Sequence, residues 1–514
     1  MNWIVGIVDI VFLKNNMVLI TTTVTISTLL IIFLTTAILI RIYHQFNKKK
    51  NKLHFAVVVL GDVGRSPRMQ YHTVSLSEIG SNSDEDIESI VTLIGYSGEE
   101  CIESLRMKNN IQVQRLKPFK NHFPGIPFIF FAIFKVSYQI GQLAWCLFIT
   151  IPSSDAILVQ NPPSIPTLVI VWIACKLHNA TFIIDWHNFG YTILSLKLSD
   201  KHPLVMISKL YERFFGQFAD SGLCVTKAMK QWLKTEWNIN ANVLYDRPPT
   251  FFRRTTLEEK HDLFQRLANE FTSVIQDNKN DDDDGSSSST TTLFTTKKKG
   301  SKKITLRKDR PLLAISSTSW TPDEDFGVLL DAIVEISEKI KKRKKMKTNK
   351  KNKFPNIIFI ITGKGPQKAM YQAKIAKLKL SEAGIYIFTM WLESSDYPLL
   401  LGSADLGISL HTSSSGLDLP MKVVDMFGCG LPVCAYDFKC LNELVVHNKN
   451  GYVFNTSDKL AEQMFSLFEN YVDKDGKELI RLGENVKEFQ ALRWKDNWNE
   501  YAKPLFIPER IATK

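Results

Sequence analysis

The chain has 514 residues, of which 45% are hydrophobic and 23% charged, and its formal net charge at pH 7 is +12. This length exceeds what one hydrophobic core usually serves, so two large domains are expected, and the apolar content excludes a chain that is disordered throughout. Residues 341–353 hold nine Lys and Arg and no acid, so this segment accounts for three quarters of the net positive charge. The charge therefore argues for a local basic insert, exposed to water or an anionic membrane surface, and against nucleic-acid binding.

Residues 17–40 form an uncharged apolar stretch of 24 residues. As a helix, this stretch is long enough to span a hydrocarbon core of about 30 Å. Five Lys and Arg follow it between residues 41 and 52, whereas Lys14 alone precedes it. The positive-inside rule therefore predicts an uncleaved single-pass anchor with the rest of the chain in the cytosol. The seven cysteines, which form no Cys-x-x-Cys pair, suit a compartment where thiols stay reduced.

A second apolar stretch, residues 123–151, carries Lys135 near its middle. A second span would separate the two halves of the chain across the membrane. We therefore expect a membrane-associated helix or hairpin that lies in the interface while Lys135 reaches toward water. A buried helix of the first domain is the alternative.

From residue 53 onward, apolar runs that suit strands alternate with helical stretches. Residues 56–60 read Ala-Val-Val-Val-Leu, and such unbroken runs suit parallel strands covered on both faces by helices. The fold class is therefore α/β, with two Rossmann-like domains at 53–250 and 311–477. Residues 277–303, rich in Asp, Ser, Thr and Lys, are expected to be a flexible low-complexity insert. The helical segment 478–514 is expected to pack back across the first domain.

The strongest local signal lies in residues 411–433, where a strand end, a polar loop, a short helix and the next strand follow one another. Small residues let backbone N–H groups approach a phosphate at the positive end of the helix, which is expected to begin at Pro420. Asp425, further along this helix, can accept hydrogen bonds from a ribose diol. A serine-rich loop without a ligand is the alternative. The residues of this expected diphosphate cradle are Ser413, Ser414, Ser415 and Gly416.

This stretch resembles the nucleotide-sugar site of GT-B glycosyltransferases. Further strings, spread over about residues 53–454, are similar to the chitobiosyldiphosphodolichol beta-mannosyltransferases. One of them reads Tyr-Asp-Arg-Pro-Pro and another Ile-Asp-Trp-His-Asn-Phe-Gly-Tyr. The strings are residues 61–72, 158–166, 184–191, 245–249 and 316–326.

The resemblance implies a GT-B fold, with two facing Rossmann-like domains, that transfers mannose with inversion from GDP-mannose to dolichol-diphosphate chitobiose. It places this β1,4 transfer, a step of N-glycan precursor synthesis, at the cytosolic face of the endoplasmic reticulum membrane, beside membrane lipid and other transferases of the pathway. It implies no tightly bound cofactor and no metal ligands, and leaves open Mg²⁺ as a counter-ion of the diphosphate. A transferase acting on another lipid-linked acceptor and an inactive scaffold subunit are the alternatives.

An inverting displacement needs a base for the acceptor hydroxyl. Asp62, after the first strand, and the pair Asp185 and His187, after a later strand, are the candidates, with Asp62 preferred. Loop-capping carboxylates are the alternative for each. Arg65 and Arg68 are expected to bind the diphosphate of the acceptor, with surface salt bridges as the alternative.

The departing diphosphate also needs positive charge. Retaining GT-B relatives supply it with an Arg and a Lys after the first strand of the second domain, but here residues 319–327 are acidic. We therefore expect Lys364, together with Lys422, to supply this charge. Trp391 stands where relatives hold the nucleobase, and a core tryptophan is the alternative.

Overall fold

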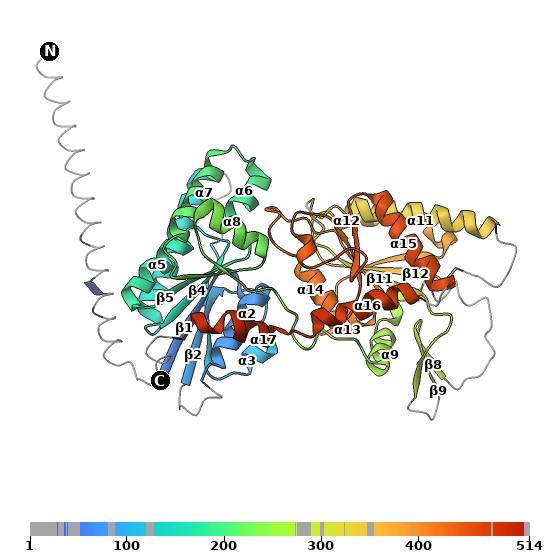
Figure 1. Cartoon of the computed structure of the whole chain (residues 1–514), viewed down its shortest axis with the longest axis horizontal. Coiled ribbons are helices and arrows are strands. Elements are labelled where there is room, and N and C mark those ends of the chain that lie inside the picture. The colour runs from blue at the N-terminus through green and yellow to red at the C-terminus, as the bar shows by residue number, and fades with distance from the viewer. Residues whose placement is uncertain are drawn as a thin grey trace, which may run out of the picture. The chain divides into compact units, whose positions relative to one another are not determined.

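The computed structural model describes most of the chain from residue 52 to residue 507, as two compact units (Figure 1). Unit 1 comprises Met1–Leu223, Leu233–Ala241 and Lys503–Lys514, and unit 2 comprises Cys224–Trp232 and Asn242–Ala502. Apart from four of its residues, the predicted anchor at 17–40 lies outside the described part of the chain. The described residues are 28, 35–36, 39, 52–80, 88–119, 128–272, 274, 289–298, 303–322, 324–346, 354–393, 395–473 and 476–507.

The first sheet has seven strands in the order β3-β2-β1-β4-β5-β6-β7, and β1 pairs in parallel with both β2 and β4. Side chains of β1 such as Val57 and Val58 are fully buried, as expected for a strand with helices on both faces. The strands are β1 (Lys52–Asp62), β2 (Glu88–Tyr96), β3 (Ile111–Leu116), β4 (Ala156–Asn161), β5 (Thr181–Trp186), β6 (Ser221–Cys224) and β7 (Asn242–Val243).

Helices connect these strands in an alternating α/β order. The helix α7 begins at a proline, whose fixed φ suits a first helical turn, and the His202 side chain caps it by accepting from Leu204 N at 3.2 Å. The helices are α2 (Pro67–Ser77), α3 (Glu103–Arg106), α4 (Phe128–Trp145), α5 (Thr167–His178), α6 (Gly190–Leu198), α7 (Pro203–Gly216) and α8 (Lys227–Trp237), with short turns η1 (Val63–Arg65) and η2 (Cys146–Thr150).

Within the described residues, Phe131–Thr150 is the one helical stretch long and apolar enough to cross a membrane, judged by length and composition. It includes most of α4 and falls inside the predicted membrane-associated segment. Only 33% of this stretch is buried. A single such helix also occurs in soluble proteins, so length and composition alone do not establish a span.

The sheet of unit 2 has six strands in the order β13-β12-β11-β14-β15-β16, and neighbouring strands pair in parallel. Alternate residues of β12 face opposite sides of the sheet. Ile357, Phe359 and Ile361 lie in one hydrophobic core, and Ile358 and Ile360 lie in the other. Both sheets therefore confirm the expected α/β fold class. The strands are β11 (Leu312–Ser317), β12 (Ile357–Thr362), β13 (Ile385–Met390), β14 (Leu406–Ser409), β15 (Val433–Tyr436) and β16 (Gly451–Phe454).

The helices of unit 2 lie on both faces of this sheet, with α11 and α15 packed side by side (Figure 1). The helices are α9 (Leu257–Arg266), α11 (Phe326–Met346), α12 (Lys368–Ala376), α13 (Asp396–Ser403), α14 (Met421–Gly428), α15 (Ser457–Asp473), α16 (Lys477–Gln490) and α17 (Trp494–Tyr501), with short turns η3 (Ala268–Phe271), η4 (Leu380–Ala383), η5 (Leu441–Glu443) and η6 (Lys503–Leu505), the last of these in unit 1.

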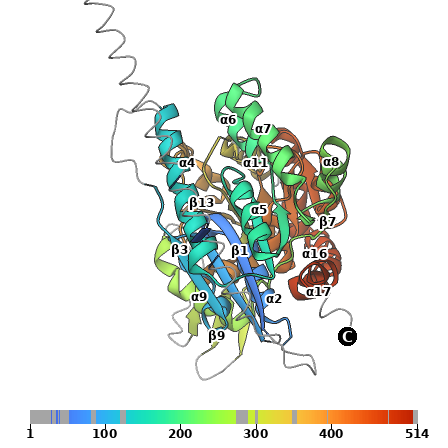
Figure 2. The same cartoon turned by 90° about the vertical axis from the view of Figure 1, so that its left-hand side faces the viewer.

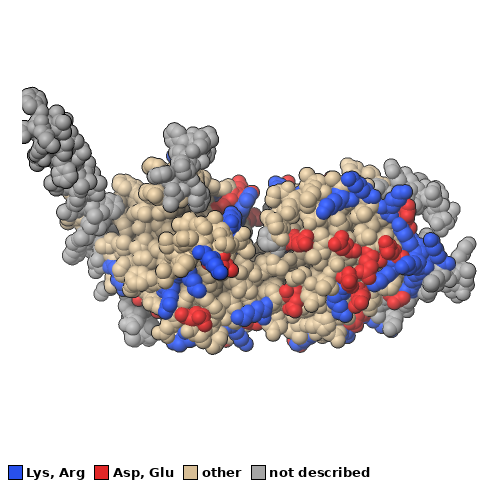
Figure 3. All heavy atoms as spheres, turned by 90° about the horizontal axis from the view of Figure 1, so that it is seen from above, with Lys and Arg blue, Asp and Glu red and all other residues tan. Residues whose placement is uncertain are grey.

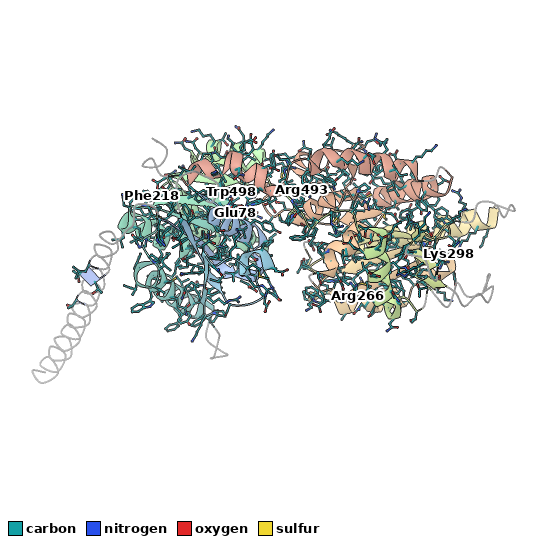
Figure 4. The ribbon with its side chains drawn as sticks, turned by 90° about the horizontal axis from the view of Figure 1, so that it is seen from below. Glu78, Phe218, Arg266, Lys298, Arg493 and Trp498 are labelled. Carbon is teal, nitrogen blue, oxygen red and sulfur yellow. The ribbon has the colours of Figure 1, made fainter. Side chains whose placement is uncertain are left out.

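The expectation of a flexible insert at residues 277–303 is wrong for its second half. Residues 289–298 form a hairpin, whose strands β8 (Ser289–Thr291) and β9 (Thr295–Lys298) pair antiparallel, and β10 (Ile304–Leu306) extends it; Figure 4 labels Lys298 at its end. Phe294 is fully buried, with its ring 4.2 Å from that of Phe264. The physical reason is that Leu293 and Phe294, set among polar tracts, provide apolar surface to bury.

The basic insert at 341–353 is not a loop over its first part, because α11 continues through Met346. Lys341 pairs with Glu382 at 2.8 Å, and Arg343 pairs with Glu469. Positive side chains at a helix C-terminus interact favourably with the helix dipole, which is why such a run can prolong a helix.

Two domain limits also differ from those expected. Residues 242–310 belong to unit 2, and so does the helical segment as far as Ala502. In unit 2, α16 packs against α14 and α15. Only the part from Lys503 belongs to unit 1, where the ring of Phe506 meets that of Phe55 edge-on at 6.1 Å.

Candidate functional site

Three strands of the sheet in unit 2 carry the predicted donor residues at their carboxyl ends. The strand order reverses at β11, which lies between β12 and β14, and ligands of open α/β sheets bind at such a switch point. Lys364 follows β12, Trp391 follows β13, and the serine loop follows β14. The order of the strands therefore places residues far apart in sequence at one edge of one sheet.

The loop after β14 is held in shape by Asp418. Its carboxylate accepts from the hydroxyl of Ser413 and from that of Ser415 at 3.4 Å, while Ser415 Oγ accepts from Leu417 N at 3.2 Å. Gly416 has a φ of +71°, which favours glycine. The predicted cradle is therefore a preorganised turn, with Ser414 at its centre.

The helix after this loop begins at Met421, with Pro420 as its N-cap residue rather than its first helical residue. Asp425 lies in the second turn, partly buried. Within the described residues no group donates a hydrogen bond to its carboxyl group, and burial, followed by the nearby charge of Asp246, raises its pKa well above the ordinary value. A carboxylate in this state gains most from new donors, as a ribose diol would provide.

Glu324 is the centre of the loop after β11 and was not among the site residues predicted from the sequence. Its side chain is 5% exposed, and it accepts from Ser319 N at 2.6 Å, from Thr318 Oγ1 at 3.1 Å and from Lys422 Nζ. Burial opposes ionisation, but the nearby His411 and Lys422 outweigh it and lower the pKa of Glu324.

The pairing of Glu324 corrects one expectation. Lys422 was expected to offer its charge to a diphosphate, but Glu324 already neutralises it. The acidic stretch 319–327 was visible in the sequence. The pairing of Glu324 with Lys422 could not be predicted, because 98 residues separate them in the sequence.

His411, the second residue after β14, lies between two carboxylates. Its Nδ1 is 3.9 Å from Glu324 and its Nε2 is 3.5 Å from Asp418. Burial favours the neutral ring, but the two carboxylates outweigh it and raise the pKa of His411 to about 9. At pH 7 this imidazole is therefore a cation beside the serine loop. The sequence signal for it was its position at the start of that loop.

Lys364 and Trp391, predicted separately, are brought together. Lys364 Nζ lies 3.9 Å from the centre of the Trp391 ring, within the range of a cation–π contact. Gly363 and Gly365 flank the lysine, and a Cβ on either would come within 1.8 Å of a carbonyl oxygen of the β11 loop. Trp391 is 58% exposed, which excludes a core tryptophan. Among the described residues no carboxylate pairs with Lys364, so its charge is available.

In unit 1, Asp185 at the end of β5 holds three basic side chains. Arg68 donates to both of its oxygens, at 2.8 and 2.9 Å, His72 Nε2 lies 3.1 Å from Oδ2, and His187 Nε2 lies 2.7 Å from the same oxygen. Asp185, Arg68 and His72 are at most 4% exposed, whereas His187 is 22% exposed. Only the histidine of the β5–α6 loop therefore reaches solvent.

This arrangement contradicts the acceptor-binding role expected of Arg68. It also restricts Asp185 to orienting a neighbouring side chain. The guanidinium of Arg68 is buried and engaged, so it cannot also grip an acceptor diphosphate. Burial opposes ionisation of Asp185, but Arg68 and then His187 outweigh it and lower its pKa well below the ordinary value. Burial in turn lowers the pKa of His72. Asp185 is thus suited to orient His187 and poorly suited to accept a proton.

Asp62 caps its own loop. Its two oxygens accept from Gly64 N at 3.0 Å and from Glu99 N at 3.1 Å. Arg65 is 72% exposed and pairs with Glu99 at 2.9 Å. Capping accounts for Asp62 without a catalytic role, while Arg65 keeps an accessible guanidinium. In the part of the chain that the structure describes, no group of three or more His, Cys, Asp or Glu could hold a metal ion.

Comparisons with known proteins agree with this architecture. A family described as glycosyl transferases group 1 matches residues 300–489. A protein from Arabidopsis thaliana, named UDP-glycosyltransferase TURAN, is 43% identical over 457 residues, which cover 87% of this chain and 96% of the relative. A chitobiosyldiphosphodolichol beta-mannosyltransferase from Homo sapiens is 42% identical over 465 residues, 90% of this chain and 95% of the relative.

A sucrose-phosphate synthase from Thermosynechococcus elongatus shares the fold, with a TM-score of 0.55 at 10% sequence identity, covering 87% of this chain and 96% of that structure. This likeness concerns the fold alone. Together with the group 1 match and the two parallel sheets, it confirms the GT-B fold.

Proposed function

We propose, from the premise that the chain belongs to the family of chitobiosyldiphosphodolichol beta-mannosyltransferases, that it transfers mannose from GDP-mannose to dolichol-diphosphate chitobiose. The observation that carries this proposal is the similarity to the human enzyme, which runs through nearly the whole chain. The match covers 90% of this chain and 95% of the human enzyme.

Unit 2 would hold the donor. The backbone N–H groups of residues 413–416, at the start of α14, bind the diphosphate of GDP-mannose, because a helix N-terminus attracts anions. Asp425 accepts hydrogen bonds from the ribose diol, and Trp391 lies where the nucleobase would be held. Lys364 and the protonated His411 stabilise the negative charge that develops on the departing GDP.

Unit 1 would bind the acceptor and supply the base. His187 Nε2 is engaged by Asp185, so Nδ1 is the nitrogen left to take the proton from the acceptor's 4-hydroxyl. The hydroxyl oxygen attacks the anomeric carbon of mannose from the face opposite GDP. The bond to the diphosphate oxygen breaks, and GDP leaves with the electron pair. Inversion of the α-linked donor yields the β1,4 bond. The exposed guanidinium of Arg65 would bind the diphosphate of the acceptor.

The setting proposed for this reaction is the cytosolic face of the endoplasmic reticulum membrane, with residues 17–40 as a single-pass anchor and other transferases of the pathway as neighbours. Mg²⁺ would serve only as a counter-ion of a diphosphate. Adding a chelator to the assay tests this role, and a rate that stays within about twofold is expected if the cationic side chains suffice.

The transfer itself is tested with the detergent-solubilised full chain, radiolabelled GDP-mannose and a phytanyl-diphosphate chitobiose acceptor. A product that β-mannosidase removes would support both donor and stereochemistry. UDP-sugars serve as the control, because the Arabidopsis relative is named a UDP-glycosyltransferase. Transfer from a UDP-sugar alone would overturn the donor, and transfer to a different lipid acceptor would overturn the acceptor. No transfer by a folded, GDP-binding protein would favour a scaffold subunit.

A further inference from the structure

The helical hairpin formed by α6 and α7 exposes an unusual number of large apolar side chains. On α7 they recur at spacings of one, three and four residues, so they share one face of the helix. Their exposed fractions lie between 40% and 63%. The six residues are Ile193, Leu196, Met206, Ile207, Leu210 and Phe214.

The opposite side of the hairpin is firmly packed, so this exposure is not the result of a loosely placed element. Glu212 of α7 is fully buried and accepts from Gly190 N, the first residue of α6, at 2.7 Å. Tyr211 donates to Pro166 O at 3.3 Å and accepts from Val169 N at 3.2 Å. Both helices are therefore fixed to the body of unit 1 while their apolar face points away from it.

Positive charge surrounds this apolar face. Four exposed cations and a single exposed acid, Asp200, lie on the hairpin. Among the described residues no carboxylate pairs with any of the four cations. An apolar face bordered by unpaired Lys and Arg is typical of helices that lie in the headgroup region of a membrane. The cations are Lys197, Lys201, Lys209 and Arg213.

The hairpin is also continuous with the most apolar helix described. The helix α5 contacts both α4 and α7, and Figure 2 shows these helices on the side of unit 1 that faces the viewer. On α4, Ile133, Phe134 and Trp145 are 57% to 60% exposed. Figure 3, seen from above, shows broad uncharged surface over unit 1 and dense charge over part of unit 2.

We propose that the α6–α7 hairpin is a membrane-docking surface, whose six apolar side chains enter the boundary between headgroups and acyl chains while its four cations contact lipid phosphates. Exposed apolar patches of this kind mark interaction sites, and the flanking cations favour an anionic lipid surface over an apolar protein partner. The hairpin is separate in sequence from the anchor expected at residues 17–40 and from α4.

Docking of the hairpin would also affect the position of the proposed base. This one point rests on the proposed function. The hairpin begins directly after the loop that carries His187, and Glu212 ties its first residue to α7. A docked hairpin would therefore hold the proposed base at the membrane surface, where a lipid-linked acceptor lies.

The position of the hairpin is tested in the full chain, reconstituted into vesicles of phosphatidylcholine and phosphatidylinositol. All seven native cysteines are buried, so a fluorophore can be attached selectively to Leu210→Cys. The matched control is Ile480→Cys on α16 of unit 2, where the native side chain is 59% exposed. We expect nitroxide-labelled lipids to quench the label at residue 210 and not the label at residue 480.

Two results would overturn the proposal. A label at residue 210 that soluble iodide reaches as easily as the label at residue 480 would show that the hairpin faces water. A label shielded from iodide but not quenched by nitroxide lipids would show that protein, such as a second copy of the chain, covers it.

A second variant separates docking from catalysis. Ile207→Asp with Leu210→Asp should lower the rate in phosphatidylinositol vesicles on the order of tenfold, because two apolar anchors are lost, and change the rate in detergent less than about twofold. Ile480→Asp is the control and should change neither. Equal rates of the double variant and the native chain in vesicles would contradict docking, whereas absent transfer by the native chain would contradict only the proposed function.

Discussion

Asp185 in unit 1 and Glu324 in unit 2 are both nearly inaccessible carboxylates that hold several donors at the carboxyl ends of parallel strands. They differ in which neighbouring side chains remain free to contact a ligand. Glu324 neutralises Lys422 and shares His411 with Asp418, while Lys364 and Asp425 have no ionic partner among the described residues. Asp185 engages Arg68, His72 and His187, and only His187 reaches solvent.

This comparison shows that a charged residue in a candidate site is not by itself a candidate for ligand binding. A buried carboxylate must be paired, because an unpaired buried charge is costly. Arg68 and Lys422 meet that requirement and are thereby removed from the list of free cations. The groups expected to touch substrate are those that the two carboxylates do not neutralise, such as Lys364, and those that they orient, such as His187.

The largest effect is expected from Asp185→Asn. This change leaves the buried guanidinium of Arg68 without its counter-charge, and loss of one partner of a buried pair typically costs about 3 to 5 kcal/mol. We expect the free energy of unfolding to fall by about 3 kcal/mol and transfer to be abolished. Urea denaturation followed by tryptophan fluorescence measures the first. Asp62→Asn is the matched control, and equal losses in both variants would show that Asp185 is not distinctive.

His187→Gln should remove the base while keeping the fold. General-base catalysis contributes about 10² to 10⁴-fold, so kcat should fall by about that factor with an unchanged urea midpoint. A variant that keeps the rate of the native chain would exclude His187 as the base.

Lys364→Met should lower kcat by about 10 to 100-fold, because it removes a positive charge from the departing diphosphate while keeping most of the volume of the side chain. Lys374→Met is the matched control, since Lys374 Nζ also lies over an aromatic ring, 5.0 Å from that of Tyr371. Initial rates at saturating donor provide the measurement. Equal effects of the two substitutions would mean that the charge of Lys364 has no specific role.

The smallest effect is expected from the charge of His411. The pKa of a histidine is ordinarily 6.5, and here burial is outweighed by Asp418 and Glu324, which raise it to about 9. The resulting stabilisation is fully present below pH 6.5 and is lost as the pH rises through about 9. Affinity for GDP should weaken over the same interval.

Calorimetric titration of GDP between pH 7 and pH 10 measures this loss, and His411→Gln should bind GDP with the same affinity at both ends of the range. A native chain whose GDP affinity stays constant up to pH 10 would show that the imidazolium does not contribute to diphosphate binding.

Much of the donor side was predictable because its signals are local in sequence. The small residues after β14, the aspartate in the following helix and the glycines around Lys364 each occur within a few residues of a strand end. Parallel strands bring such ends to one edge of a sheet whatever the chain length between them. Lys364 and Trp391 could therefore be named before their contact was known.

The partners of the charged residues could not be predicted in the same way. Arg68 and Asp185 lie 117 residues apart, and Lys422 and Glu324 lie 98 residues apart. Sequence alone does not distinguish a cation that awaits a ligand from one that is already neutralised. Likewise, the polar composition around Phe294 suggested a flexible segment, and only packing against Phe264 revealed a buried hairpin.

The sequence by itself determined the α/β class, the two Rossmann-like halves and the positions of the loops that bear functional residues, because hydrophobic periodicity and glycine placement act over short distances. The tertiary structure alone decided which carboxylates are buried, which cations they neutralise and which side of α6 and α7 is left exposed. The physical reason is that burial and charge pairing depend on neighbours that are distant in the chain.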